Sequence, residues 1–346
     1  MANKVLHIVW GFKLGGIETM LVNIINEQVA RGIEATLIII NDIVDESLIA
    51  RLDSRIKVVR IGRYTKSRNP WPILKLNLMI WQAKGHIIHC HSHTILNYLL
   101  PPLRRRCYVT IHNTRVVKEA TTLRQSAKIF AISKAVSKEL CENFGINSTI
   151  IYNGIDFSKI SPRILFNTNN SGIRLLQLGR LTEQKGHYIS IGAMALLRDK
   201  DISLDIIGDG ELRNKLEEQI AENKLESKVR LLGARNQEYI FSHLKEYDAL
   251  LQPSIFEGFG LVAVEAMAAK IPVIASDIDG LAEVLDNGRY GICFPSGNIS
   301  ECANAINRLC EMPYNEARLN EIYDYAKSNF DVKKTAENYI NEYSKR

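Results

Sequence analysis

Two glutamates close together near the start of an apolar segment form the most distinctive group of chemically active side chains. Glu257 lies in a glycine-containing loop, and Glu265 lies eight residues later in a run typical of a buried helix. A carboxylate on a buried helix needs a partner, because desolvating an unpaired charge costs free energy. Hydroxyls of a ribose or sugar would supply one, and the N–H groups of Phe259, Gly260 and Leu261 could bind sugar hydroxyls or phosphate. A partly exposed helix-start glutamate, favoured by the helix dipole, is the alternative.

Two cations follow an expected strand in the second half of the chain. Arg180 comes shortly after the apolar run Ile173–Leu178, and Lys185 precedes a segment with helical spacing. Two cations at the carboxyl end of a strand would neutralise a diphosphate, Arg through its planar fork and Lys as a point charge. Two exposed loop cations are the alternative, but Gly179 and Gly186 beside them favour phosphate binding.

A glycine pair precedes the first expected helix. Gly15 and Gly16 lie between the apolar run Val5–Trp10 and the segment Ile17–Arg31, which has helical spacing. Glycines let the backbone approach a ligand closely, and a helix N-terminus offers free N–H groups to an anion. The pattern is not G-x-G-x-x-G, which disfavours an NAD-dependent dehydrogenase. A tight strand-to-helix turn is the alternative.

These candidate residues follow strands in a repeated alternation of strand and helix patterns. Such alternation is typical of parallel sheets covered by helices, in which ligands bind outside the carboxyl ends of the strands. The expected strands are Val5–Trp10, Ala35–Ile40, Ile56–Ile61, Ile87–Cys90, Tyr108–Ile111, Lys128–Ile132, Thr149–Tyr152, Ile173–Leu178, Ser203–Ile207, Val229–Leu232, Ala249–Gln252, Val273–Ala275 and Gly291–Phe294. We therefore predict an α/β protein.

A polar segment divides the chain. Residues 161–172 combine Pro162 with Asn, Thr and Ser, which is linker composition, and the strand pattern restarts after them. A chain of 346 residues, at roughly 100–200 residues per domain, also suggests two domains. We expect Rossmann-like domains over 1–164 and 165–330, and a final helix within 331–346.

The motifs together resemble those of the retaining family 4 glycosyltransferases, which have the GT-B fold of two Rossmann-like domains facing across a cleft. Glu257 and Glu265 match the E-x7-E motif of that family, and Arg180 and Lys185 match its diphosphate-binding pair. Further matches are Gly15-Gly16-x-Glu18, Asn153-Gly154-Ile155-Asp156, Gly208-Asp209-Gly210 and Gly233. The resemblance covers essentially the whole chain.

The resemblance implies a role for each matched residue of the second, nucleotide-sugar-binding domain. Glu265 would bind the ribose, and Glu257 the hydroxyls of the donor sugar near its anomeric carbon. Arg180 and Lys185 would stabilise the leaving diphosphate. Configuration at the anomeric carbon would be retained, without a metal or another cofactor.

The first, acceptor-binding domain has implied roles too. The backbone of Gly15 and Gly16 would reach the donor phosphates, and His112 would contact the sugar and take part in catalysis. A packed histidine at a strand end is the alternative for His112. The resemblance also implies that the final helix crosses back to this domain.

Two patterns raise the question of a metal. Asp277-Ile-Asp279 is a D-x-D sequence, but it lies in a loop where the resembled family usually carries two glycines. His89, His91 and His93 alternate along an extended segment, yet no complete set of four zinc ligands is evident. We expect no metal site, and we expect His91 to lie at a strand end near the acceptor.

The first half of the chain is basic. The net charge is +6, but residues 1–160 carry 22 Lys and Arg against 11 Asp and Glu, whereas residues 161–346 carry 22 against 27. A basic half suggests an anionic partner. Arg63, Arg68, Trp71 and Arg105 are candidates for contact with the acceptor or a membrane surface, with a core helix beside a basic loop as the alternative. The absence of a recognition motif argues against nucleic acid.

Location and redox state follow from apolar runs and cysteines. No apolar run reaches the roughly 20 residues of a membrane span, and no cleavage site follows the first apolar stretch. We expect a cytoplasmic protein, with a peripheral position at the inner face of the membrane left open. The six cysteines are scattered without a C-x-x-C and are expected to be buried, reduced thiols.

These observations predict a transferase that moves a sugar from a nucleotide-diphosphate sugar to a saccharide acceptor. Uridine is the favoured base because it is common in the resembled family. The basic half favours a lipid-linked acceptor in surface polysaccharide synthesis. A nucleotide-sugar epimerase on the same fold remains the alternative.

Overall fold

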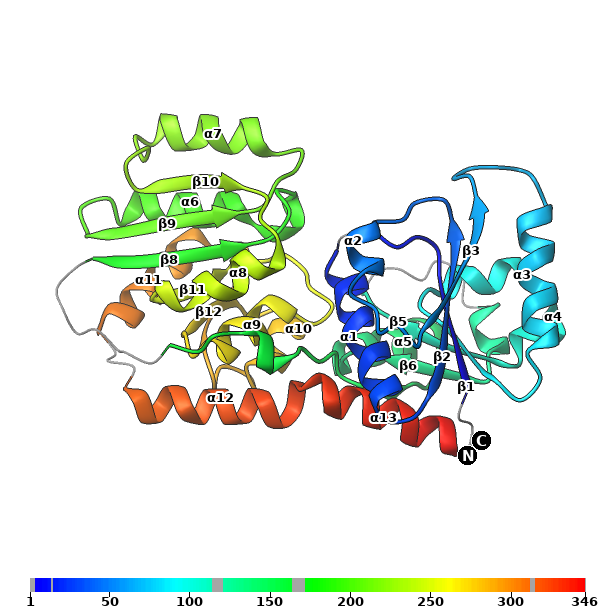
Figure 1. The fold of residues 1–346 in the computed structure, drawn as a ribbon. Helices are drawn as coiled ribbons and strands as arrows, with labels where there is room; N and C mark the ends of the chain where they lie inside the picture. The colour runs from blue at the N-terminus through cyan, green and yellow to red at the C-terminus, as the bar shows by residue number, and fades with distance from the viewer. Residues whose placement is uncertain (1–3, 14, 114–120, 164–171, 312–314, 346) are drawn as a thin grey trace. The chain divides into compact units, whose positions relative to one another are not determined.

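The computed structural model describes residues 4–13, 15–113, 121–163, 172–311 and 315–345. The chain divides into two compact units, Met1–Ile155 with Phe330–Arg346, and Asp156–Asn329 (Figure 1). The division between Ile155 and Asp156 precedes the polar segment that contains the expected boundary, and most of that segment lies outside the described residues.

The described part of the first unit contains a seven-stranded parallel sheet in the order β3-β2-β1-β4-β5-β6-β7. The strands are β1 (Lys4–Val9), β2 (Glu34–Asn41), β3 (Lys57–Arg63), β4 (Ile87–Cys90), β5 (Cys107–Ile111), β6 (Lys128–Ala131) and β7 (Thr149–Ile150). The helices are α1 (Gly16–Ala30), α2 (Glu46–Ile49), α3 (Trp71–Gln82), α4 (Pro101–Arg104), α5 (Lys134–Phe144) and α13 (Val332–Ser344), with short 3-10 helices η1 (His93–Tyr98) and η2 (Leu123–Gln125).

The described part of the second unit contains a six-stranded parallel sheet in the order β10-β9-β8-β11-β12-β13. The strands are β8 (Ile173–Leu178), β9 (Ile202–Ile207), β10 (Val229–Gly233), β11 (Ala249–Gln252), β12 (Val273–Ser276) and β13 (Ile292–Phe294). The helices are α6 (His187–Leu196), α7 (Arg213–Glu222), α8 (Gln237–His243), α9 (Leu261–Ala268), α10 (Asp279–Val284), α11 (Ile299–Glu311) and α12 (Glu316–Phe330), with η3 (Phe157–Lys159), η4 (Glu183–Lys185) and η5 (Leu244–Glu246).

The expected strands agree with the observed ones to within two residues at each end. Strands buried on both faces of a parallel sheet are continuous apolar runs, so each one is visible in the sequence by itself. All four residues of β4 and of β11 are buried, for example. The α/β fold class predicted from the alternation is confirmed.

The final helix belongs to the first unit. The chain at Ile155 pairs with the segment before α13, since the Ile155 N–H donates to Phe330 O at 2.9 Å and the Val332 N–H donates to Ile155 O at 2.9 Å. The Thr335 hydroxyl donates to Tyr152 O at 2.9 Å. α13 then packs against α1 and buries Tyr339 and Tyr343. The Asn-Gly-Ile-Asp motif, residues 153–156, therefore contacts the start of α13 and fixes its position.

Each sheet has one point at which the strand order reverses. In the first sheet this point lies between β1 and β4, and in the second it lies between β8 and β11. The connections leaving two such neighbouring strands run to opposite sides of the sheet, which leaves a crevice at the carboxyl ends. These two points are where ligand-binding residues are expected.

The six cysteines are predicted from the sequence to be buried, reduced thiols. All six cysteines are free; Cys90, Cys107 and Cys302 are buried and Cys293 is half-buried, but Cys141 and Cys310 are exposed, so the expectation of burial is wrong for those two. Both exposed residues lie on the outer faces of amphipathic helices, Cys141 on α5 and Cys310 on α11.

Among the described residues, no helix is long and apolar enough to cross a membrane.

Candidate functional site

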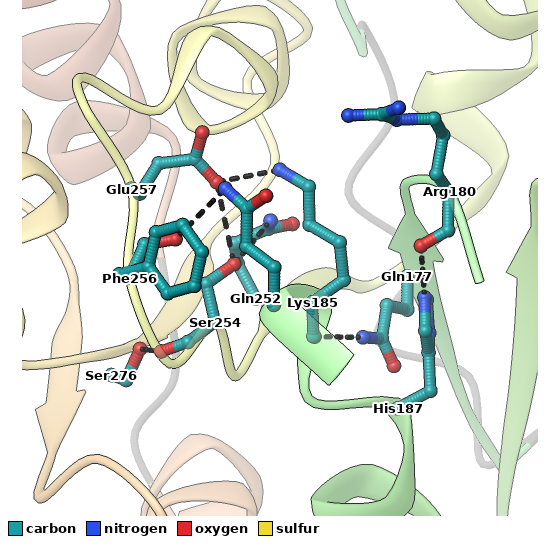
Figure 2. A network of polar contacts seen from close by, with 10 residues as sticks. Gln177, Arg180, Lys185, His187, Gln252, Ser254, Phe256, Glu257 and Ser276 are labelled. Atoms are coloured by element: carbon teal, nitrogen blue, oxygen red, sulfur yellow. Dashed lines mark hydrogen bonds and ion pairs between the residues drawn. The ribbon is translucent and has the colours of Figure 1, made fainter. Parts of the chain in front are cut away.

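The candidate cations and glutamates of the second unit gather where its strand order reverses. Arg180 follows β8, Lys185 ends η4, and Glu257 lies in the loop after β11. The Lys185 Nζ and Glu257 Oε2 atoms are 2.5 Å apart, and their side chains are only 15% and 17% exposed (Figure 2). The fold thus brings together two residues that are 72 positions apart in the chain.

Polar residues at the strand ends hold the Glu257 loop in place. The Ser254 hydroxyl donates to Glu257 Oε2 at 3.4 Å, and Gln252 Nε2 donates to Ser254 Oγ at 3.0 Å. The Ser276 hydroxyl, at the end of β12, donates to Ser254 O at 2.5 Å (Figure 2). Sequence reasoning missed Gln252, Ser254 and Ser276; their signal was a polar side chain directly at the end of an apolar strand.

The backbone around Lys185 is fixed by a second polar chain. Gln177 Nε2 donates to Lys185 O at 3.0 Å, and the Ser190 hydroxyl donates to Gln177 Oε1 at 2.7 Å. Gly186 has φ 63°, and a Cβ there would lie 2.0 Å from Pro253 O. Glycine is required at this position, because the turn must approach the exit of β11 closely.

Arg180 is held through its backbone and leaves its side chain available. The His187 Nε2–H donates to Arg180 O at 3.0 Å (Figure 2). Burial lowers the pKa of His187 to about 4, so this imidazole is neutral at pH 7. The Arg180 side chain is exposed and makes no hydrogen bond or ion pair with the residues that the structure describes. Of the two candidate cations, Arg180 is therefore the one without a described side-chain partner, since Lys185 pairs with Glu257.

Glu265 lies on α9, whose buried face confirms the predicted apolar helix. Gly260, with φ 97°, turns the chain into this helix, and a Cβ there would lie 2.6 Å from Leu281. Desolvation raises the pKa of Glu265 to about 8. Within the described residues nothing hydrogen-bonds to its carboxyl group, which leaves that group available to a ligand. Phe259 is 2% exposed, so its side chain is part of the core.

In the first unit, the glycine pair forms the start of α1. Gly15 is the N-cap residue in an extended conformation, and Gly16 is the first helical residue. As a glycine, Gly15 has no side chain to cap this terminus, and the Glu18 carboxylate lies over it, 2.7 Å from where a Cβ would stand; a Cβ added to Gly16 would meet nothing within 4 Å. The glycine pair thus lies between the carboxyl end of β1 and the start of α1, which agrees with the predicted position of this loop.

Four buried histidines lie on β1, β4 and the ends of β4 and β5 in the first unit; they are His7, His89, His91 and His112. His7 Nε2 donates to Gln28 Oε1 at 2.9 Å, and His7 Nδ1 then accepts a hydrogen bond from the His91 Nε2–H at 3.0 Å. This chain leaves His91 Nδ1 as a buried acceptor without a partner among the described residues. His112, whose ring centroid is 5.7 Å from that of His91, lacks a described partner on both nitrogens. Burial lowers the pKa of His112 to about 4.

The histidines also include the one set of three possible metal ligands found in the described residues. Nitrogens of His7, His89 and His91 all lie within 4.8 Å of one another. Both ring nitrogens of His89 already bond, to Tyr343 Oη and Thr110 Oγ1 at 2.7 Å each, and both of His7 are used as well. These contacts are those of a hydrogen-bonded core. Asp277 of the D-x-D sequence instead accepts from the Ser296 N–H at 3.0 Å.

The residues expected at the acceptor or membrane fall into two groups. Arg68, Trp71 and Arg105 are exposed. Arg63, by contrast, donates to Asn41 Oδ1 at 3.2 Å and Ser67 O at 2.9 Å and so holds a loop in place. His91 is 9% exposed, which places it beneath the surface and rules out direct contact with a membrane.

Two parallel-sheet α/β units in tandem, each with candidate residues where its strand order reverses, define the GT-B class. A glycosyltransferase from Rickettsia africae has the same fold, with a TM-score of 0.82, 20% identity and coverage of 99% of this chain and 98% of that one. HepE from Anabaena, crystallised with UDP and glucose, has a TM-score of 0.81, 21% identity and coverage of 99% and 100%.

The sequence comparisons identify the family. A model described as "Glycosyl transferases group 1" matches residues 164–328, and one described as "Glycosyltransferase Family 4" matches residues 14–159. The chain belongs to this family of glycosyltransferases.

The matches to curated proteins cover part of each relative. An uncharacterised glycosyltransferase of Methanocaldococcus jannaschii is 35% identical over 192 residues, which are 56% of this chain and 51% of the relative. The N-acetylgalactosamine-N,N'-diacetylbacillosaminyl-diphospho-undecaprenol 4-alpha-N-acetylgalactosaminyltransferase of Campylobacter jejuni is 32% identical over 183 residues, 52% of this chain and 49% of the relative. The chain spans about half the length of these relatives.

Proposed function

We propose that this protein transfers a sugar, with retention of configuration, from a UDP-sugar to a saccharide acceptor. The observation that carries the proposal is the group at the carboxyl edge of the second sheet. There, Arg180, Lys185 and Glu257 surround a strand-order reversal, and Glu265 presents a desolvated carboxyl group without a described partner. Two cations suit a diphosphate, and two carboxylates suit the hydroxyls on either side of it.

Each residue would act on a different part of the donor. Glu265 would accept hydrogen bonds from the ribose hydroxyls, and Glu257 would bind the sugar hydroxyls near the anomeric carbon. Lys185 now pairs with Glu257 at 2.5 Å, and it would share its charge with the β-phosphate once a donor is bound. Arg180, which is exposed and unpaired among the described residues, would bind the same diphosphate.

The reaction would follow from where charge develops. The bond between the anomeric carbon and the β-phosphate oxygen breaks, and negative charge collects on the phosphate beside Arg180 and Lys185. The acceptor hydroxyl attacks the anomeric carbon from the same face, forming the new glycosidic bond. Its proton passes to the leaving phosphate. No step requires a metal ion.

In the first unit, His112 and the Gly15-Gly16 backbone would complete the binding of the donor. The two ring nitrogens of His112 are buried without a described partner, which is costly unless a ligand supplies one. A neutral imidazole, as the lowered pKa of about 4 implies, offers one donor and one acceptor to sugar hydroxyls.

The acceptor in this proposal is a lipid-linked saccharide of the kind used in surface polysaccharide synthesis. The Campylobacter jejuni relative carries a diphospho-undecaprenol acceptor in its name. The basic composition of residues 1–160 suits a diphosphate-linked lipid. UDP as the carrier is supported by HepE, which was crystallised with UDP.

Calorimetry with a chelator present tests the donor site. Titration of UDP, GDP, ADP and NAD should give tight binding of UDP alone, and Glu265→Ala should weaken that binding at least about tenfold, because it removes the hydrogen bonds between the ribose hydroxyls and the buried carboxyl group. Glu222→Ala, at an exposed position on α7, is the matched control. Binding that appears only after addition of Mn²⁺ would contradict the metal-free proposal and point to Asp277 and Asp279.

Product analysis separates transfer from epimerisation. Incubation of the protein with UDP-sugars in the absence of an acceptor should leave the sugar nucleotide unchanged apart from slow hydrolysis. Accumulation of a free epimerised sugar nucleotide would instead identify an epimerase that uses the same nucleotide site.

A further inference from the structure

Helix α3 is apolar on two opposite faces. One face buries Leu76 and Ile80 against the rest of the first unit. The other face exposes Trp71, Leu74, Leu78 and Trp81, whose side chains are 72%, 52%, 52% and 58% accessible. These four positions follow each other at helical spacing and form one stripe. A surface helix ordinarily carries polar residues on its outer face, so this stripe calls for a partner.

The stripe continues onto neighbouring segments that hold it rigidly. Asn77 Nδ2 donates to Tyr98 O at 2.9 Å, and the Leu100 N–H donates to Asn77 Oδ1 at 2.8 Å. Leu100, at the start of α4, is 61% exposed. Arg106 donates to Ile80 O and Ala83 O at the end of α3. Figure 1 shows α3 and α4 side by side. We call Trp71, Leu74, Leu78, Trp81 and Leu100 the α3 surface.

The stretch of sequence that forms the α3 surface carries cations and no acidic residue. The sequence has no Asp or Glu between Asp53 and Glu119. Exposed cations lie before α3, on it, after it and after α4; they are Lys66, Arg68, Lys75, Lys84 and Arg105. Basic side chains beside an exposed aromatic and aliphatic stripe complement a surface with anionic headgroups above an apolar layer.

We propose that the α3 surface docks on an anionic lipid bilayer, with α3 lying in the plane of the interface. Trp71 and Trp81 stand at the two ends of the helix, and tryptophan favours the headgroup level of a membrane. Leu74, Leu78 and Leu100 would enter the boundary with the acyl chains. Docking extends the proposed function, because it would bring the chain to a lipid-linked acceptor, but vesicle binding does not depend on catalysis.

Co-sedimentation with vesicles tests the proposal. The whole protein should bind vesicles of phosphatidylglycerol and phosphatidylcholine, bind vesicles of phosphatidylcholine alone at least about tenfold more weakly, and lose binding as salt is raised. W71S/W81S should reduce binding to the anionic vesicles at least about tenfold. L196S is the matched control, because Leu196 is 60% exposed on α6 of the other unit. Unchanged binding by W71S/W81S, or no vesicle binding at low salt, would overturn the proposal.

Tryptophan emission reports the same event at the residues themselves. Trp71 and Trp81 are exposed, whereas Trp10 donates to Thr94 Oγ1 and packs edge-on against Tyr98. Anionic vesicles should shift the emission to shorter wavelength, and lipids with brominated acyl chains should quench it. An unshifted and unquenched emission would contradict docking.

Two further measurements separate the possible reasons for failure. Titration of UDP into W71S/W81S should give wild-type affinity, so a loss of vesicle binding with intact UDP binding supports docking independently of the proposed reaction. Sedimentation velocity tests the competing occupant, a second copy of the chain. A wild-type dimer that becomes monomeric in W71S/W81S, without any vesicle binding, would overturn the membrane assignment.

Discussion

At the residue scale, Glu265 combines a carboxyl group with an environment that disfavours its charge. Desolvation raises its pKa to about 8, so the carboxyl group is largely protonated in the ligand-free protein at neutral pH. A hydrogen-bonding ligand such as ribose would compensate for that desolvation. In the ligand-free protein, ionisation of Glu265 should therefore lower the free energy of unfolding, by an amount that grows as pH rises.

The expected pH dependence has a definite sign. The folded-state pKa of Glu265 lies above the unfolded value of 4.5, so its contribution to stability is largest below pH 4.5 and is lost as pH rises through 8. Glu265→Gln should leave the free energy of unfolding nearly unchanged at pH 4.5 and raise it by about 1–2 kcal/mol at pH 9, a value reduced because solvent reaches part of the side chain.

Urea unfolding at the two pH values measures this difference. Glu222→Gln, at an exposed position on α7, serves as the control and should change nothing at either pH. An equal effect of Glu265→Gln at pH 4.5 and pH 9 would contradict the assignment of a raised pKa.

The pair Lys185 and Glu257 makes a second prediction at this scale. Both side chains are mostly buried, so removal of one leaves the other charge poorly solvated. Lys185→Ala and Glu257→Ala should each lower the free energy of unfolding by about 1–3 kcal/mol, and the double variant should lose less than the two losses added together. Chemical denaturation of all four proteins gives the coupling. Strict additivity would show that the 2.5 Å contact contributes nothing.

At the element scale, Gly154 decides how α13 meets the first unit. A Cβ at this position would lie 2.7 Å from the backbone N and Cα of Val332 and 2.5 Å from Thr335 Oγ1. The start of α13 follows immediately, so the clash cannot be relieved by a flexible side-chain end. The glycine of this motif therefore serves the packing of a helix.

Gly154 and Gly16 should respond differently to the same substitution. Gly154→Ala should lower the free energy of unfolding by at least about 2 kcal/mol, because backbone atoms must move. Gly16→Ala should change it by less than about 0.5 kcal/mol, since a Cβ there meets nothing within 4 Å, yet it should slow sugar transfer if this backbone approaches the donor. Denaturation and transfer assays distinguish the two. Normal stability of Gly154→Ala would refute the packing argument.

At the scale of the whole molecule, the two units differ in their buried imidazoles. His7, His89, His91 and His112 are buried in the first unit, and burial lowers the pKa of each. The second unit has His187, with a pKa of about 4. Folded pKa values below the unfolded value of 6.5 contribute stability above pH 6.5, and that stability is lost as pH falls towards 4.

Acid should therefore unfold the first unit before the second. All three tryptophans, at positions 10, 71 and 81, belong to the first unit, so their fluorescence reports on that unit alone. The acid transition followed by tryptophan emission should have a higher midpoint pH than the loss of far-UV circular dichroism. His112→Leu should lower the midpoint of the fluorescence transition, and His86→Gln, near the surface, should not. Coincident transitions by both probes would contradict the prediction.

The sequence by itself determined the strands and the identity of the candidate site residues. Buried parallel strands are local apolar runs, and motifs such as the one joining Glu257 and Glu265 are local spacings, so both are visible without any long-range contact. Arg180 and Lys185 were found the same way, because both lie in the segment between a strand and the next helix.

Only the tertiary structure decided which of these residues touch. Strand order and packing bring Lys185 against Glu257 and His7 against His91. They also place α13 against Gly154 and leave the second apolar face of α3 exposed. In the sequence, an apolar residue such as Leu78 gives the same pattern whether its side chain is buried in a core or exposed on the surface. Its exposure is set by which neighbours the folded chain places against it, and a local pattern carries no information about those neighbours.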